Sequence, residues 1–528
     1  MFIGEKINKI RTEAKLTQRQ FSEILGVAQQ SVHKWESGQA NPDIEKIIMI
    51  SKYFDVSLDA LLLGNDNRVV EEMRHTQSIK PQYENIHNWE FYSSNLLTEY
   101  RQSFEEGLDI ERYKDVFSSA SMLPAGEIKK KLGDVLFEVV ASADRRKDYP
   151  YVEPSELEKI KSLRKKDGFS GEYNFGDLEN KIHGAWMGRV CGCMLGKTVE
   201  GIQTNELIPF LKESNNYPMQ RYIYKSDINN DVITKYNYGF AGRCYADEID
   251  GMPVDDDTNY VVLAQEIIDK YGRDFTPFDV SRAWMTYQGK DAYCTAERVA
   301  FCNFVKGYAP PESAIRKNPY REWIGAQIRG DYFGYINPAD PELAAEMAWR
   351  DASISHVKNG IYGEMLVAAM LAVAATTDNI ETIILGGLAE IPHTSRLYED
   401  IMAVYRTFKD GASQKECFAM IHSKYDEYTE HGWCHTIPNA MIVAASLLYG
   451  EGDFGKSICM AVETGFDTDC NGATVGSVLG MANGYDSISD YWKAPFNDTL
   501  YTSIFGVGAV KISECAKKTM EHIVKKES

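Results

Sequence analysis

The chain has 528 residues, of which 44% are hydrophobic and 25% are charged. This composition excludes a disordered or collagen-like chain, and the length corresponds to roughly two to four globular domains. The net charge of −20 argues against nonspecific coating of nucleic acid or of an anionic membrane. The ten cysteines form no CxxC pair, which favours reduced thiols over a disulfide framework or a zinc ribbon.

No segment of the sequence predicts a membrane span or a secretion signal. The longest apolar run, residues 365–375, is too short to cross a bilayer, and the N-terminal residues contain no apolar signal region. We therefore expect a cytoplasmic protein with no membrane partner. Residues 1–66 hold eight Lys/Arg and nine Asp/Glu, so this segment is the only one that could approach DNA without strong repulsion.

Residues 1–66 predict a small helical domain. Thr17 is a candidate N-cap of a helix, and Gln20 stands three residues later, as in a capping box. Gly26 ends that helix, and a second helix follows with Val32 and Trp35 on its inner face.

The pattern LTQRQFSEILGVAQQSVHKWESGQANPD resembles the helix-turn-helix module of Cro/repressor-like (XRE-type) regulators, and the similarity covers residues 5–64. The resemblance implies a five-helix domain that binds double-stranded DNA, as a possible homodimer, with its second helix in the major groove. The side chains expected at the DNA are Gln29, Gln30, Ser31 and Lys34 at the bases and Gln18 at a phosphate. The alternative is a docking domain that has lost DNA binding.

Residues 67–175 predict a helical connecting segment. Residues 121–149 read as an amphipathic helix, and residues 155–166 read as a charged helix. No catalytic constellation is evident here, so we expect a spacer or a dimerisation element. Residues 176–522 are mostly helical in pattern, with Gly and Ala in the helix interiors. The predicted fold class is all-α, a small five-helix domain followed by a large all-helical one.

Two acidic clusters stand at predicted helix starts in the large domain. The first is Asp255-Asp256-Asp257, and the second contains Asp467 and Asp469. Helix capping alone would explain one or two of these acids, but three consecutive carboxylates repel each other unless solvent or a cation neutralises them. If the two helix starts face each other, they form a hard oxygen site for Mg²⁺ or Mn²⁺, and two such ions would make a hydrolytic centre.

Three motifs in this domain resemble the ADP-ribosylglycohydrolase family, which includes the dinitrogenase-reductase-activating glycohydrolases. They are GAWMGRVCGCMLGKTVEG (184–201), DDDT (255–258) and GFDTDCNGATVGSVLG (465–480), and they stand in the family's order. The similarity covers about residues 177–520. It implies hydrolysis of an N- or O-glycosidic bond to ADP-ribose, in an ADP-ribosylated protein or a small ADP-ribosyl molecule, with two Mg²⁺ (or Mn²⁺) ions.

The resemblance also implies roles for individual residues. The metal ligands would be Asp255, Asp256, Asp257, Asp467, Asp469 and Cys470. The catalytic residues would be Glu200, as the acid/base group, with Asp256 and Asp467. The residues expected at the substrate are Arg329, Asp331, His356, Asn471 and Gly472.

The sequence departs from the family pattern at four places. Asp255 and Cys470 replace threonines, Cys193 replaces an aspartate, and residues 325–342 replace a substrate-contacting loop. We expect a metal-dependent ADP-ribosyl hydrolase fused to a DNA-binding module. One alternative is a transcription regulator whose large domain senses ADP-ribose or NAD-type ligands without turnover, and another is an enzyme acting on small glycosides or nucleosides. The leaving group, the operator and the oligomeric state stay open.

Overall fold

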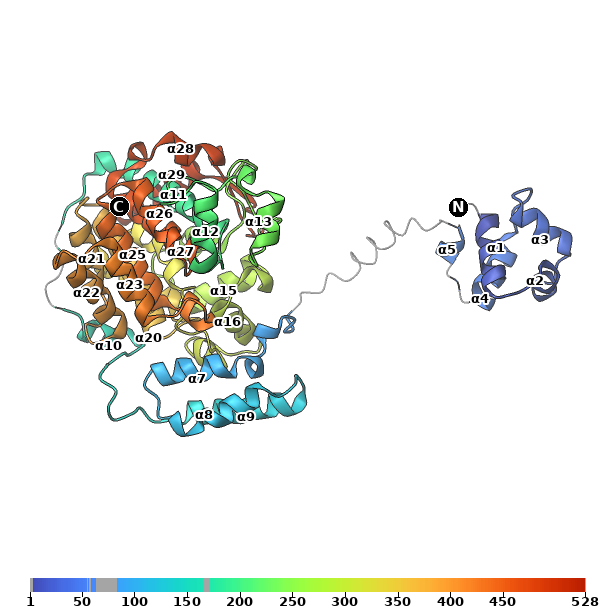
Figure 1. Cartoon of the computed structure of the whole chain (residues 1–528), viewed down its shortest axis with the longest axis horizontal. Coiled ribbons are helices and arrows are strands. Elements are labelled where there is room, and N and C mark those ends of the chain that lie inside the picture. The colour runs from blue at the N-terminus through green and yellow to red at the C-terminus, as the bar shows by residue number, and fades with distance from the viewer. Residues whose placement is uncertain are drawn as a thin grey trace. The chain divides into compact units, whose positions relative to one another are not determined.

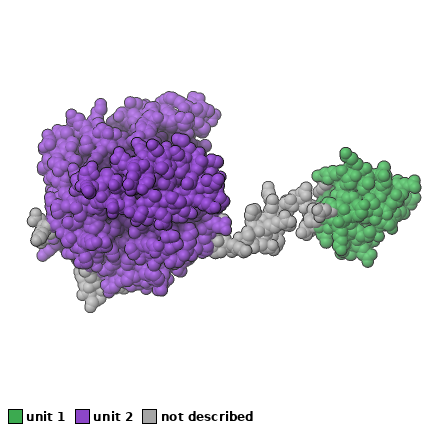
Figure 2. Space-filling model, turned by 90° about the horizontal axis from the view of Figure 1, so that it is seen from below, with its two compact units in different colours: residues 1–82 green, residues 83–528 purple. Residues whose placement is uncertain are grey.

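A computed structural model of the chain describes residues 3–54, 56, 58–62, 83–165, 169 and 171–527. The chain forms two compact units, residues 1–82 and residues 83–528 (Figures 1 and 2). Helices dominate the described residues, which contain almost no strand, so the predicted all-α class is confirmed. None of their helices combines the length and apolar character required to cross a bilayer. The predicted boundary at residue 66 lies outside the described residues.

The N-terminal unit is built from short helices around one small core. They are α1 Ile3–Glu13, α2 Gln18–Leu25, α3 Gln29–Glu36, α4 Ile44–Tyr53 and α5 Leu58–Leu62. Thr17 and Gln20 form the predicted capping box, in which the Thr17 backbone N–H donates to Gln20 Oε1 at 2.9 Å. Gly26 adopts a φ of 65°, which lets α2 end and the chain turn into α3. Val32 and Trp35 are buried, as predicted.

Residues 83–165 are attached to the large unit rather than being a free spacer. Their elements are η1 Asn88–Glu90, η2 Tyr92–Ser94, α7 Leu96–Glu105, η3 Glu111–Tyr113, α8 Lys114–Ser121, α9 Glu127–Ala141 and α10 Leu157–Ser162. Arg321 of the large unit binds Glu99 at 2.9 Å and Glu106 at 2.6 Å, and all three side chains are buried. The expectation of a spacer is therefore wrong for this part, because its charged residues have buried partners more than 200 residues away in sequence.

The remaining helices form the body of the large unit (Figure 1). In its first half they are α11 Phe175–Lys197, α12 Thr204–Glu213, η4 Lys225–Asp227, α13 Asn230–Lys235, α14 Asp256–Tyr271, α15 Pro277–Tyr287, η5 Lys290–Ala292, α16 Ala296–Val305, α17 Glu312–Ile315, η6 Gln327–Arg329, α18 Asp331–Tyr335 and α19 Pro341–Ala352.

In its second half the helices are α20 Lys358–Ala374, α21 Ile380–Leu388, α22 Arg396–Lys409, α23 Gln414–Lys424, α24 Glu430–Cys434, α25 Thr436–Gly450, α26 Phe454–Glu463, α27 Thr468–Asn483, η7 Tyr485–Ser487, α28 Asp490–Lys493, η8 Ala494–Phe496 and α29 Ile512–Glu527. One antiparallel pair joins β1 Thr499–Tyr501 to β2 Ala509–Lys511, with Thr499 opposite Lys511. The core is one large apolar cluster in which α20 and α25 are buried along most of their length.

Helices α11 and α27 pack antiparallel along a glycine seam. Its paired positions are Gly184 with Gly480, Gly188 with Gly476, and Gly192 with Gly472. Residues four apart share one face of a helix, so this spacing gives each helix a smooth stripe. A Cβ atom at Gly188 would lie 2.1 Å from the Gly476 carbonyl oxygen, so a larger side chain would force the helices apart. The seam therefore brings the C-terminal end of α11 to the N-terminal end of α27.

Candidate functional site

Three helix ends meet where the glycine seam finishes. Asp255 is the N-cap of α14 and accepts a hydrogen bond from the Asp257 backbone N–H at 2.9 Å. Asp467 occupies the N-cap position of α27, but its side chain makes no capping hydrogen bond. The Thr468 hydroxyl donates to the Gly196 carbonyl of α11 at 2.9 Å. Capping therefore explains Asp255 but leaves the carboxylate of Asp467 for another role.

The side chains at these ends form two adjacent donor groups. In each group the ligand atoms lie within 4.8 Å of one another, and all the residues are buried. The first group is Cys193, Asp255 and Asp257, and the second is Asp257, Asp469 and Cys470. Because Asp257 belongs to both, the two groups are continuous. The structure thus brings together the two acidic clusters that stand more than 200 residues apart in the sequence.

The cluster carries more negative than positive charge. Within the described residues, its ion pairs are those of Arg189 with Asp257, at 3.0 Å, and of Lys197 with Asp255, at 2.6 Å. Burial and the neighbouring carboxylates raise the pKa of Asp256 and Asp469 well above the usual range. Asp257 Oδ2 and Asp469 Oδ1 are buried without a hydrogen-bond partner. Unpaired buried carboxylate oxygens in this number suit a site for a divalent cation.

Glu200 lies just beyond α11, next to the same carboxylates. Burial, together with Asp467 and Asp255, raises the pKa of the Glu200 carboxyl to about 7. Such a group exchanges a proton near neutral pH, as general acid–base catalysis requires. The hydroxyl of Tyr238 donates to the Glu200 carbonyl oxygen at 3.1 Å and so fixes the backbone beneath it.

The start of α27 is held by side-chain amides. The Asp467 backbone N–H donates to Asn439 Oδ1 at 3.1 Å, and the Asn471 side-chain amide donates to the same oxygen at 2.8 Å. The Cys434 thiol lies 3.4 Å from Asp467 Oδ2. Asn471 is fully buried and orients this turn, whereas Gly472 belongs to the glycine seam. The substrate contacts expected of these two residues stay predictions.

The sequence pattern of the ADP-ribosylglycohydrolase family matches residues 176–523, about two thirds of the chain. The chain belongs to the ADP-ribosylglycohydrolase family. A helix-turn-helix pattern matches residues 7–61, so an ADP-ribosylglycohydrolase domain is fused here to a domain of the kind found in transcription regulators.

The matching relatives share the N-terminal part. The chain is 37% identical over 87 residues to the HTH-type transcriptional activator BcrR of Enterococcus faecalis, which covers 16% of this chain and 43% of that protein. It is 39% identical over 67 residues to the uncharacterized HTH-type transcriptional regulator YqaE of Bacillus subtilis, covering 13% of this chain and 58% of the relative. The chain thus spans about half the length of the curated relatives it matches.

A solved ADP-ribosylglycohydrolase-related protein complex is also similar. The sequence identity is 15% and the TM-score is 0.39, over 66% of this chain and 99% of the other. A likeness this weak adds nothing to the family assignment.

Three residues predicted at the substrate of this ADP-ribosylglycohydrolase domain lie in the protein interior. The Arg329 guanidinium is bound by Asp351 at 2.6 Å and Glu297 at 3.0 Å, so it has no free face for a diphosphate. Asp331 pairs with Arg189 at 3.0 Å and is fully buried. His356 is also buried, and its Nδ1 lies 2.8 Å from the Ser355 hydroxyl. In this structure the three side chains bind protein groups, and their contact with substrate stays a prediction.

A third group of possible metal ligands lies away from these two and consists of Glu105, His431 and His435. Its arrangement is better explained by hydrogen bonds. His431 Nδ1 accepts from the Trp323 indole at 3.2 Å, and His435 Nδ1 accepts from the Ile437 backbone N–H at 3.2 Å. A neutral ring whose Nδ1 accepts must carry its proton on Nε2. His431 therefore donates from Nε2 to Glu105 at 3.1 Å, and neither ring offers a lone pair to a metal.

The predicted DNA-contacting residues lie mostly on the exposed face of α3. Gln29, Gln30 and Lys34 are exposed, and Ser31 is half-buried. The Gln18 amide instead donates to Glu36 Oε2 at 2.7 Å, and Glu36 also binds Arg11. Gln18 thus ties α2 to α3, and the phosphate contact of its side chain stays a prediction.

Sequence reasoning did not identify every residue of the centre. Asn439 and Cys434 lie in none of the three motifs and are found only through the fold, and Lys197 lies in the first motif but was not singled out. Cys193 was noted as a departure from the family pattern but not as a candidate ligand. A usable signal was the Gly-x-x-x-Gly repetition in both motif-bearing helices, which predicts their close approach.

Proposed function

We propose that the large unit is a metal-dependent hydrolase of an ADP-ribosyl glycosidic bond and that the N-terminal unit binds double-stranded DNA. The observation that carries the first part is the buried surplus of carboxylate at the meeting of α11, α14 and α27. The substrate would be an ADP-ribosylated protein or a small ADP-ribosyl molecule. The cofactor would be Mg²⁺ or Mn²⁺, as two ions.

The residues present fit such ions. Asp257 Oδ2 and Asp469 Oδ1 have no other partner, and Asp467 is not used as a cap. The ligands would be Asp255, Asp256, Asp257, Asp467 and Asp469. When bound, divalent ions supply the positive charge that balances these carboxylates and polarises water for hydrolysis.

Glu200 would act as the general acid or base. Hydrolysis through an oxocarbenium-like transition state needs a carboxyl group that gives or takes a proton at the glycosidic oxygen, the leaving nitrogen or the attacking water. Because the pKa of Glu200 is about 7, both of its protonation states are populated at neutral pH. Asn439 would keep Asp467 facing the ribose through the hydrogen bond to its backbone.

The experiment combines metal binding and product release in the full-length protein. We expect wild-type protein, stripped with EDTA, to bind Mg²⁺ or Mn²⁺ in calorimetry and then to release ADP-ribose from ADP-ribosylated protein or small-molecule substrates. Asp256→Ala and Asp467→Ala should lose both properties, whereas Asp378→Ala, at an exposed position, should keep them. Full turnover in EDTA would refute the proposal.

One observation favours regulation without turnover. Cys470 stands where the family pattern has a hydroxyl, and burial raises the pKa of its thiol well above the usual range. A protonated thiol is a poor ligand for a hard ion. If the domain only senses its ligand, ADP-ribose should bind in calorimetry while no tested ADP-ribosyl substrate is hydrolysed under any metal.

For the N-terminal unit, we propose sequence-specific binding, as a dimer on an inverted repeat. Selection from random duplexes should return an enriched site. Gln30→Ala should cost about 1–3 kcal/mol at one base pair, because glutamine pairs bidentately with adenine. Gln39→Ala, exposed and outside α3, is the matched control. Absence of any enriched sequence at low salt would leave the docking-domain alternative.

A further inference from the structure

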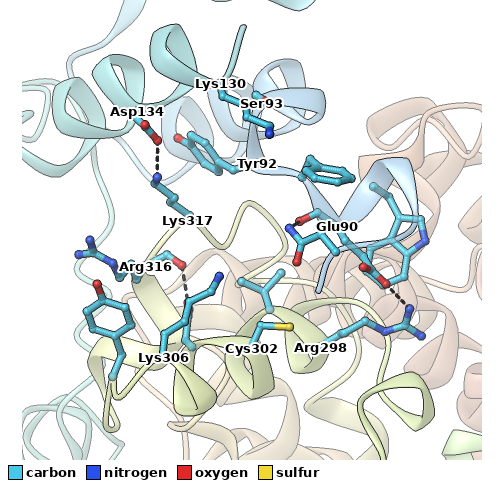
Figure 3. A pocket seen from close by; sticks show the side chains of 16 residues that line it. Glu90, Tyr92, Ser93, Lys130, Asp134, Arg298, Cys302, Lys306, Arg316 and Lys317 are labelled. Carbon is cyan, nitrogen blue, oxygen red and sulfur yellow. Dashed lines mark hydrogen bonds and ion pairs between the residues drawn. The ribbon is translucent and has the colours of Figure 1, made fainter. Parts of the chain in front are cut away.

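A cavity of ≈ 340 Å³ lies within the large unit, between residues 85–93, helix α9 and helix α16 (Figure 3). Its wall is completed by Tyr308, Arg316 and Lys317. None of the carboxylates at the candidate metal centre lines it. Its volume falls within the roughly 300–1,000 Å³ of small-molecule sites.

The cavity is positively charged although the chain has a net charge of −20. Its basic residues are Lys130, Arg298, Lys306, Arg316 and Lys317, and its acidic residues are Glu90 and Asp134. Both acids are already neutralised. Glu90 binds Arg298 at 2.6 Å and Lys290 at 3.3 Å, and Asp134 binds Lys317.

Three cations therefore remain available to an anion. Among the described residues, Lys306 has no ion pair, and Figure 3 shows its side chain rising from α16 into the space below Tyr92 and Lys317. Within the described part of the chain, Lys130 forms an ion pair with the exposed Glu127, at 3.0 Å. Arg316 forms one with Glu312, at 3.6 Å, and its guanidinium covers the Tyr308 ring at 4.2 Å. Partners this exposed are exchanged for a multiply charged anion at little cost.

Aromatic rings form the other part of the wall. Trp89, Phe91, Tyr92 and Tyr308 all line the cavity. Trp89 is covered on one side by Arg298, at 4.6 Å, whereas Phe91 makes no ring contact within the described part of the chain. A flat ring can stack on such a wall.

We propose that this cavity binds a small organic phosphate that carries a planar ring, of mononucleotide size. Lys306, Lys130 and Arg316 bind the phosphate, and Phe91 and Tyr92 hold the ring. The ligand contacts residues 85–93 and α16 together, so it ties the first described residues after the N-terminal unit to the hydrolase body. The site is separate from the proposed catalytic centre and does not depend on it.

The test is calorimetry of the full-length chain in EDTA at low salt, with adenosine 5′-monophosphate, adenosine and orthophosphate as probes. We expect saturable binding of the monophosphate by wild-type protein and by Asp256→Ala, which removes a residue of the other centre. Adenosine and orthophosphate should each bind at least tenfold more weakly. Lys306→Gln should weaken binding at least tenfold, and Lys306→Arg should retain it.

The matched control is Lys456→Gln, at an exposed lysine of α26 outside the cavity, which should bind as wild type. Because Lys306 is exposed, Lys306→Gln should unfold at the wild-type urea midpoint, and Lys130→Gln provides a second variant of the cavity wall. The proposal is overturned if the monophosphate does not bind saturably, if adenosine or orthophosphate binds equally well, or if Lys306→Gln has no effect. Loss of binding in Asp256→Ala would instead place the ligand at the other centre.

Discussion

Two sets of buried carboxylates in the large unit show opposite electrostatics. The paired carboxylates attach residues 83–165 to the rest of the large unit and face Arg321, Arg396 and Lys358. They are Glu99, Glu106, Glu153 and Glu322. The site carboxylates, Asp255, Asp256, Asp257, Asp467 and Asp469, face one another.

Burial alone would raise the pKa of Glu106, Glu322, Asp256 and Asp469. Among the paired carboxylates, Arg321 and Lys358 nevertheless hold the pKa of Glu106 below its usual range, and Arg396 does the same for Glu322. At the site, the pKa of Asp469 is raised well above its usual range. The difference teaches that burial of acids does not mark a binding site, whereas burial of acids without matching cations does.

The largest expected effect is on kcat, at Glu200, whose pKa is raised by burial and by the neighbouring carboxylates. Glu200→Gln should leave metal binding unchanged and lower kcat by about 10²–10⁴-fold, because the amide cannot exchange a proton. With Glu200 acting as the acid, kcat should fall as pH rises past its pKa, which is about 7 without metal and lower when cations are bound. The pH profile of kcat checks this, and a Glu200→Gln enzyme with the same basic limb would contradict the assignment.

The next effect is on the free energy of unfolding, at the paired carboxylates. Glu322→Gln should lower the free energy of unfolding by about 3–5 kcal/mol, because it leaves the buried Arg396 with only Glu153 to balance it. Urea unfolding of the full chain measures this. Glu346→Gln, at a half-buried acid of α19, is the control and should cost far less. If Glu322→Gln and Glu346→Gln lowered the free energy of unfolding equally, the ion pairs of the paired carboxylates would not be what holds residues 83–165 in place.

A smaller effect, of opposite sign, is expected at the site. In EDTA at pH 8, Asp469→Asn should raise the free energy of unfolding by about 1 kcal/mol, because it removes repulsion among the site carboxylates. A carboxyl whose pKa is raised on folding binds more protons in the folded state, so the wild-type protein loses stability as pH rises from about 4. The gain should therefore vanish at low pH, and saturating Mg²⁺ should reverse its sign. Urea unfolding at pH 5 and pH 8 tests this, and destabilisation in EDTA would contradict it.

The smallest effect is expected at Cys470, the cysteine next to the site carboxylates. Cys470→Thr should strengthen Mg²⁺ binding by a few fold, since Mg²⁺ prefers oxygen to a protonated thiol. Calorimetry measures this, with Cys459→Thr, a buried cysteine of α26, as the control. If Co²⁺ binding to the wild-type protein gave a thiolate-to-cobalt charge-transfer band that Cys470→Thr lacked, the thiol would be a ligand and the site would suit a softer ion.

Sequence reasoning reached the local structure and the acids but not the partners of buried charges. The capping box at Thr17 and Gln20 was predictable because all its atoms come from one helical turn. The acidic clusters were recognised through motif order. The ion pairs of Arg329 with Glu297 and of Asp331 with Arg189 were not predicted, because helix packing brings these residues together from distant parts of the sequence. The attachment of residues 83–165 to the large unit was not predicted for the same reason.

The glycine seam has a consequence for the order in which the protein acquires its parts during synthesis. The described contacts of the helix-turn-helix core join residues within the first 62 positions, so this core can fold soon after it leaves the ribosome. Helix α11 must wait for α27, whose last residue is Asn483. Until then the glycine face of α11 lacks its partner helix, and the carboxylates of the two clusters are not assembled. A nascent or truncated chain can therefore hold a folded helix-turn-helix core before the candidate metal centre is complete.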